Sequence, residues 1–66
     1  MARKVRDVIV ALERNGWVLV RERGSHRQFR HPDSPFVVTV AGKPSTTVPP
    51  GILSSIRRMS GLDELR

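Results

Sequence analysis

The chain has 66 residues, with 12 lysines and arginines against six acidic residues, which gives a formal net charge of +6 at pH 7. This length allows one small domain, residues 1–66, with a limited core. The absence of cysteine excludes a disulfide framework and thiolate metal ligands. No apolar run approaches the length of about 20 residues that crosses a membrane, and no apolar leader follows the first residues. We therefore expect a soluble cytoplasmic protein with no membrane partner.

The charge balance favours a polyanionic partner, nucleic acid above all. Lys4 and Lys43 are the only lysines, so ten of the 12 basic residues are arginines. Arginine offers a planar, bidentate fork for phosphate that lysine lacks. Composition alone leaves a second interpretation equally open, in which the arginines only keep the surface soluble.

The first predicted element is an amphipathic helix from Arg3 to Asn15. Apolar residues recur there at helical spacing, namely Val5, Val8, Ile9 and Leu12. Gly16 fits the left-handed position that often follows the last helical turn.

Two short strands, residues 17–23 and 26–31, follow and are joined at Gly24-Ser25. A glycine in the first position of a two-residue loop favours a type II′ turn, because that position needs a positive φ. The register then pairs Arg23 with His26, Arg21 with Gln28, Leu19 with Arg30, Glu22 with Arg27 and Val20 with Phe29. Because side chains alternate between faces, one face should carry Val18, Val20 and Phe29. The opposite face should carry Arg21, Arg23, His26, Gln28 and Arg30.

The second half of the chain predicts a third strand and a second helix. Residues 36–40 are all β-branched or aromatic, which favours a strand, and residues 41–48 indicate a polar loop. A helix should follow Pro49-Pro50-Gly51 and end at Gly61, with Ile52, Ile56 and Met59 on one stripe and Leu53 beside Ile56. The tail over residues 63–66 should be frayed. The order helix, three-stranded antiparallel meander, helix predicts an α+β fold in two layers, with both helices on one face of the sheet.

The chemistry that these residues permit is limited. The six acidic residues are scattered and match no metal-ligand spacing, so we expect no metal site and no cofactor. Ser25 is a poor nucleophile for His26, because neighbouring strand residues point to opposite faces. We expect His31 to make local contacts in a turn. Trp17 could stack on a base, but the core is the simpler place for it.

RNA cleavage needs few protein groups, because the 2′-hydroxyl of the substrate is an internal nucleophile. His26 could move a proton, and the surrounding arginines could neutralise the charge that develops on the phosphate. From the residues alone, a hairpin histidine without a special role is the simpler interpretation.

Residues 23–29, Arg-Gly-Ser-His-Arg-Gln-Phe, resemble the signature of HicA-type toxins, the small mRNA interferases of bacterial toxin–antitoxin pairs. The similarity extends over residues 8–17, His31-Pro32, residues 37–40 and residues 50–62. The resemblance implies an αβββα fold like that of double-stranded-RNA-binding domains. It also implies ribosome-independent, metal-independent endoribonuclease activity on mRNA, with His26 as the catalytic residue. A HicB-type antitoxin would neutralise the toxin by burying that site.

One departure from the family pattern concerns Lys43. Members often carry Pro-x-His after the third strand, where this chain has Ala41-Gly42-Lys43. A lysine keeps the positive charge but does not shuttle protons near neutral pH, so His26 remains the main acid–base candidate. The predicted site is therefore His26 with the RNA-binding residues Arg21, Arg23, Gly24, Ser25, Arg27, Arg30 and Lys43. The alternative is a small RNA-binding module without catalysis, since shape and phosphate contacts suffice for binding.

Overall fold

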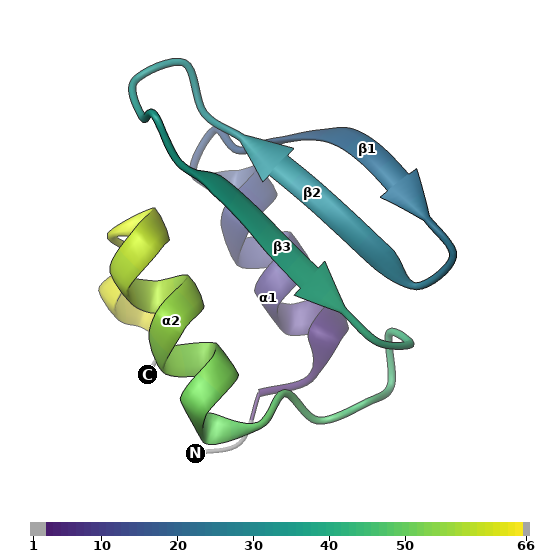
Figure 1. Ribbon diagram of the computed structural model, residues 1–66. Coiled ribbons are helices and arrows are strands. Elements are labelled where there is room, and N and C mark those ends of the chain that lie inside the picture. The colour runs from purple at the N-terminus through teal and green to yellow at the C-terminus, as the bar shows by residue number, and fades with distance from the viewer. Residues whose placement is uncertain (1–2, 66) are drawn as a thin grey trace.

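The computed structural model describes residues 3–65 and has the predicted order of elements. These are helix α1 (Val5–Arg14), strands β1 (Val18–Arg23), β2 (His26–Arg30) and β3 (Val37–Ala41), helix α2 (Pro50–Ser60) and the 3₁₀ turn η1 (Asp63–Leu65). The strands form an antiparallel sheet in the order β1-β2-β3, and both helices lie against one side of it (Figure 1). The α+β prediction is thus confirmed. No helix in the described part of the chain is long and apolar enough to cross a membrane.

The hydrophobic core lies between the sheet and the helices. Phe29 of β2 and Val38 and Val40 of β3 supply its sheet side. The helices and loops supply the rest, namely Val5, Val8, Ala11, Leu12, Trp17, Val48, Leu53, Ile56 and Leu65. Trp17 is a core residue, as expected, and is only 4% exposed.

The inward face of α2 differs from the prediction. Leu53 and Ile56, three residues apart, face the core, whereas Ile52 and Met59 are exposed. The predicted stripe of Ile52, Ile56 and Met59 was therefore wrong in two of its three members. One residue turns a helix by about 100°, so the face that meets the sheet depends on how the whole helix is seated.

Backbone contacts close both ends of α1. Its first free N–H groups, of Val5 and Arg6, donate to carbonyls of the loop between β3 and α2 at 2.9 and 3.1 Å. At the other end Gly16 has φ +89° and donates to the carbonyl of Glu13. Trp17 donates to the carbonyl of Leu12, which completes a Schellman motif. The predicted helix stop at Gly16 is confirmed, although the helix begins two residues later than expected.

The C-terminal residues are ordered, which corrects the prediction of a frayed tail. Asp63–Leu65 form η1, and the side chain of Leu65 is 2% exposed within the core. Arg66 lies outside the described residues. Burial of one apolar side chain against α1 thus holds the end of the chain in place.

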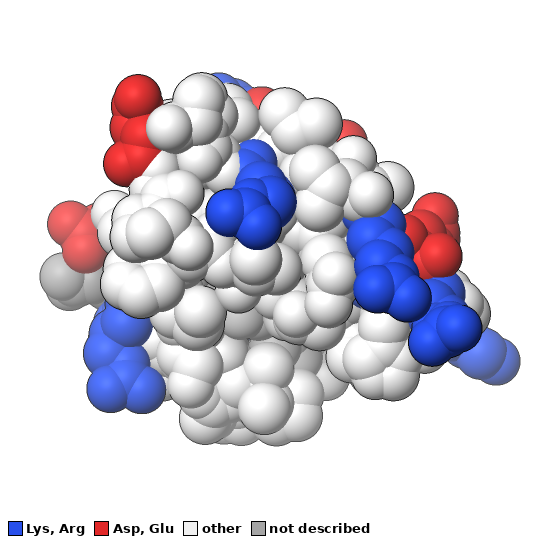
Figure 2. All heavy atoms as spheres, turned by 45° about the horizontal axis from the view of Figure 1, so that its top comes forward, with Lys and Arg blue, Asp and Glu red and all other residues white. Residues whose placement is uncertain are grey.

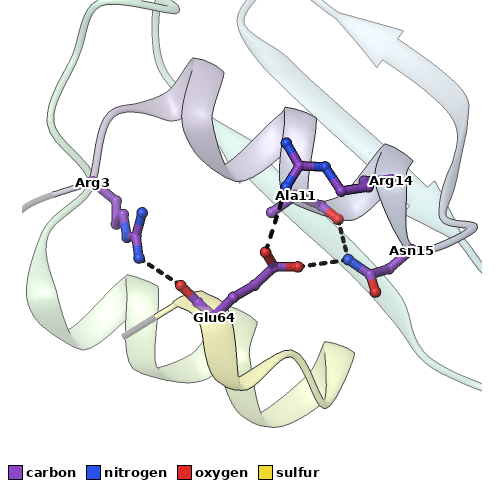
Figure 3. Close-up of polar contacts among 5 residues, drawn as sticks. All are labelled: Arg3, Ala11, Arg14, Asn15 and Glu64. Atoms are coloured by element: carbon purple, nitrogen blue, oxygen red, sulfur yellow. Dashed lines mark hydrogen bonds and ion pairs between the residues drawn. The ribbon is translucent and has the colours of Figure 1, made fainter.

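Glu64 ties this turn to the ends of α1 (Figure 3). Its carboxylate accepts a hydrogen bond from Asn15 Nδ2 at 2.6 Å and lies 4.0 Å from Arg14 Nη1. Its backbone carbonyl accepts from Arg3 Nη2 at 2.6 Å. Three residues far away in sequence therefore meet the last turn of the chain.

The hairpin of β1 and β2 keeps the predicted register only near its turn. Arg23 pairs with His26, Glu22 with Arg27 and Arg21 with Gln28. A bulge at Val20 then shifts the pairing, so that Leu19 pairs with Phe29 and Val18 with Arg30.

The bulge overturns the predicted pairs of Val20 with Phe29 and of Leu19 with Arg30. Leu19 rather than Val20 now lies opposite Phe29, Val18 lies opposite Arg30, and every residue of β1 is exposed. β1 is exposed because the helices pack over β3 and leave β1 as an uncovered edge strand.

Candidate functional site

The sheet face turned away from the helices carries the candidate site. His26 and Gln28 alternate along β2 with the buried Phe29, so they point to this open face. Cross-strand pairing places Arg21 and Arg23 of β1 on one side of them and Thr39 of β3 on the other. These five residues line a shallow depression of about 260 Å³.

The turn between β1 and β2 positions His26. Gly24 has φ +58°, whereas Ser25 is not in the left-handed region, which fits the predicted type II′ turn. His26 is the first residue after this turn, and its side chain is exposed. The imidazole is thus presented at the rim of the sheet by a short, well-defined hairpin.

The side chains of the open face that could hold an anion are not engaged by any other group in the described part of the chain. Within residues 3–65, no hydrogen bond or ion pair engages the side chains of Arg21, Arg23, His26 or Arg30. Arginines that lack an acidic neighbour keep their full capacity for an anionic ligand. In the view of Figure 2 much of the surface is uncharged, and basic side chains lie both within it and toward its edges, where the acidic side chains also lie.

Arg27 does not join this group. It lies on the helix-facing side of β2, where its side chain is 18% exposed. Its Nε lies 3.3 Å from Glu22 Oε2, and its Nη1 donates to the carbonyl of Gly42 at 3.3 Å. The predicted pairing of Glu22 with Arg27 is confirmed, and the structure separates Arg27 from His26.

Gly24, Ser25 and Lys43 lie at the turn end of the sheet. The carbonyl of Ser25 accepts a hydrogen bond from the N–H of Gly42 at 3.1 Å, which holds the loop after β3 beside the hairpin turn. Lys43 is the next residue and is exposed. All three are therefore near the end of the sheet that carries His26.

Sequence reasoning did not assign Gln28 and Thr39 to the site, although both line the depression. Gln28 was predicted on the same face as His26, so strand alternation already indicated its position. Thr39 required the register between β2 and β3, which pairs it with Gln28.

The second histidine, His31, has a structural environment. Its Nδ1 accepts the N–H of Asp33 at 3.0 Å, so Nε2 carries the proton that is donated to the carbonyl of Asn15 at 3.1 Å. Its ring also lies 5.4 Å from that of Trp17, centroid to centroid. The prediction of local contacts for His31 is confirmed, and it does not line the depression of His26.

The chemistry of the open face follows from these side chains. An exposed imidazole can accept or donate a proton, and guanidiniums on neighbouring strand positions can hold a phosphate beside it. Among residues 3–65, no three histidine or acidic side chains are grouped so that they could hold a metal ion. The arrangement suits the binding of a phosphodiester and a proton transfer at one of its oxygens.

Comparison with known protein families identifies a match over most of the chain. No curated protein matches the chain significantly. The sequence model of the family described as "HicA toxin of bacterial toxin-antitoxin" matches residues 5–62, which include every strand and both helices. Since this match covers most of the 66 residues, the chain belongs to the HicA toxin family and is a toxin of a bacterial toxin–antitoxin system.

Proposed function

We propose that this toxin is a metal-independent endoribonuclease that cleaves mRNA, with His26 as its general acid or base. Toxins of the HicA family generally cleave mRNA. The observation that carries the proposal is the exposed imidazole of His26 in a depression shared with Arg21 and Arg23. Neither guanidinium is engaged by an acidic side chain within residues 3–65.

The proposed reaction begins at the 2′-hydroxyl of the substrate. Its oxygen attacks the adjacent phosphorus, the bond to the 5′-oxygen of the next nucleotide breaks, and a 2′,3′-cyclic phosphate and a 5′-hydroxyl result. His26 either takes the proton of the 2′-hydroxyl or gives one to the leaving oxygen, and water exchanges the other proton. Arg21 and Arg23 stabilise the negative charge that builds up on the phosphate oxygens.

Substitution at the cleaved nucleotide tests this route. An RNA with a single 2′-deoxy sugar at the mapped cleavage site should bind normally and remain intact, because the internal nucleophile is missing. The fully ribose RNA should be cut at that site to a 5′-hydroxyl product. Cleavage at the deoxy position would show that the nucleophile comes from elsewhere and would contradict the proposal.

The alternative function is an RNA-binding module without catalysis. The arginines of the open face, which have no side-chain partner among residues 3–65, favour it as directly as they favour a nuclease, since phosphate contacts alone give binding. Product formation separates the two functions, whereas affinity does not. RNA bound and recovered intact, with no products even at high enzyme concentration, would support the alternative.

The family implies an antitoxin partner for this chain. We propose that it is of the HicB type and that it neutralises the toxin by covering His26 and its neighbours. The exposure of these side chains supports this, because the same surface is open to RNA and to a protein. Since mRNA is the proposed substrate, the proposed place of action is the cytoplasm.

A further inference from the structure

We infer that Gln28 reads a base next to the scissile phosphate and thereby determines where this toxin cuts. The inference rests on the proposed nuclease function and adds a residue that selects among RNA sequences. The depression is lined unevenly, because three of its five side chains are basic or titratable and two are amide or hydroxyl side chains that do not titrate.

The neutral pair is Gln28 and Thr39, which lie directly opposite each other on β2 and β3. Guanidinium contacts to phosphates position a nucleic acid but carry no sequence information. Base identity is read through hydrogen bonds to base edges, and a carboxamide offers both a donor and an acceptor for them. The hydroxyl of Thr39 also donates and accepts, but only through one oxygen, whereas the amide of Gln28 can make two hydrogen bonds to one base edge at once and is therefore better suited to tell one base from another.

The position of Gln28 fits this role. It belongs to the central strand and is partly buried, with Arg21 as its other cross-strand neighbour. Within residues 3–65 no hydrogen bond engages its side-chain amide. The amide is thus held within the depression with its donor and acceptor unused.

The spacing along β2 supports the same conclusion. Gln28 follows His26 by two residues on the same face, which is about 7 Å along a strand, and Arg30 follows by about 7 Å more. A single RNA strand laid along β2 would have its reacting phosphate at His26 and another phosphate at Arg30. A base from the stretch between these two phosphates would lie over Gln28. Single-stranded RNA suits this arrangement, because its unstacked bases expose their hydrogen-bonding edges.

Mapping of cleavage sites tests the inference. An unstructured RNA that contains every dinucleotide step would be cut by the wild type and by the variants Gln28→Ala, Gln28→Glu and Arg30→Gln. We expect Gln28→Ala to reduce the preference at one nucleotide position by about tenfold or more, while cleavage continues at many steps. Gln28→Glu, which keeps the shape but replaces the donor by an acceptor, should shift the preference toward bases that donate. Arg30→Gln should slow cleavage at every dinucleotide step by the same factor, because a contact to a phosphate does not depend on the base sequence.

A binding measurement gives a readout without catalysis. In the background His26→Ala, the affinities for the best-cut and the worst-cut sequence would be compared with and without Gln28→Ala. We expect the ratio of the two affinities to fall toward one in the double variant. Circular dichroism and thermal melts would show that each variant is folded, and Gln28→Glu provides an isosteric replacement if Gln28→Ala is not.

The outcomes separate the inference from the proposed function. An unchanged cleavage map and affinity ratio in the Gln28 variants, with cleavage still dependent on His26, would overturn the role of Gln28 alone. A wild-type protein that cuts every step equally would do the same. A wild-type protein that does not cleave RNA would overturn the proposed function, and the inference with it.

Discussion

Arg21 and Arg27 are both arginines of the same hairpin, yet they have opposite surroundings. The guanidinium of Arg27 contacts Glu22 and the carbonyl of Gly42 on the helix-facing side of the sheet. Arg21 lines the open depression, and within residues 3–65 it has no side-chain partner. Strand alternation and cross-strand register together decide this difference, because Arg21 pairs with Gln28, which is the neighbour of Arg27 along β2 and points to the other face.

A matched pair of variants tests this assignment. Arg21→Gln should weaken the binding of RNA and leave the free energy of unfolding almost unchanged, because the lost charge faces solvent. Arg27→Gln should lower the free energy of unfolding by about 1 kcal/mol, since a partly buried ion pair and a hydrogen bond are lost, and should leave binding intact. Fluorescence anisotropy and urea denaturation measure the two effects. The reverse pattern would show that the faces are assigned wrongly.

The two histidines illustrate what sequence can establish at this scale. The turn at Gly24-Ser25 and strand alternation were enough to place His26 beside Arg23 on one face. The turn residues after His31 correctly indicated local contacts, such as the hydrogen bond from the N–H of Asp33. The contact between the rings of His31 and Trp17 joins two segments that no local sequence pattern connects. Thr39 was not predicted as a site residue, because its position in the depression depends on the cross-strand register between β2 and β3.

At the scale of elements, the sequence predicted the number, type and order of the main helices and strands. It did not predict which strands the helices pack over. Gly16 and Gly61 have positive φ at the predicted ends of α1 and α2, and Gly24 has positive φ in the predicted hairpin turn. The bulge at Val20 left no such signal, because residues 18–20 are all apolar and either register looks acceptable. Whether an apolar strand is buried depends on where the helices lie, and here they leave β1 exposed.

The C-terminal turn is the element that the sequence pattern did not predict. Only two apolar residues, Leu62 and Leu65, follow the glycine that ends α2, which is too few for a periodic pattern to predict the burial of Leu65. Its place is set by contacts with residues at the start of the chain, including the bond from Arg3 to the carbonyl of Glu64. Contacts between residues so far apart in the sequence cannot be predicted from patterns within a short segment.

Leu65 should therefore matter more for stability than an equally apolar residue on the surface. Leu65→Ala is expected to lower the free energy of unfolding by about 2–5 kcal/mol, because it removes a buried side chain and leaves a cavity. Ile52→Ala, at a site that is 52% exposed on α2, should cost less than about 1 kcal/mol. Urea denaturation of both variants measures the difference. Equal effects would show that the C-terminal turn does not pack as described.

For the whole molecule, the distribution of charge matters more than its sum. The formal charge of +6 is shared among basic residues with different surroundings. Arg14 and Arg27 contact acidic side chains, whereas Arg21, Arg23 and Arg30 share the open sheet face without partners among residues 3–65. In so small a protein, with its core on one side of a three-stranded sheet, the other side is left free for a ligand.

This distribution predicts how RNA binding depends on salt. If three arginines neutralise phosphates, the logarithm of the affinity should fall against the logarithm of salt concentration with a slope near −2, at about −0.7 per phosphate on a single strand. Each replacement of Arg21, Arg23 or Arg30 by glutamine should reduce the slope by about 0.7. Titrations with the variant His26→Ala avoid cleavage during the measurement. A slope near zero would contradict binding through these arginines.

The central claim is that His26 gives this toxin a metal-independent nuclease activity. Its most direct test is cleavage of a defined mRNA in EDTA by the wild type and by His26→Ala, with His31→Ala as the matched histidine control at a temperature where it remains folded. We predict that the wild type and His31→Ala cut the RNA and that His26→Ala binds it without cutting. Cleavage by His26→Ala at the wild-type rate would contradict the claim, as would the absence of cleavage by a folded, RNA-binding wild type.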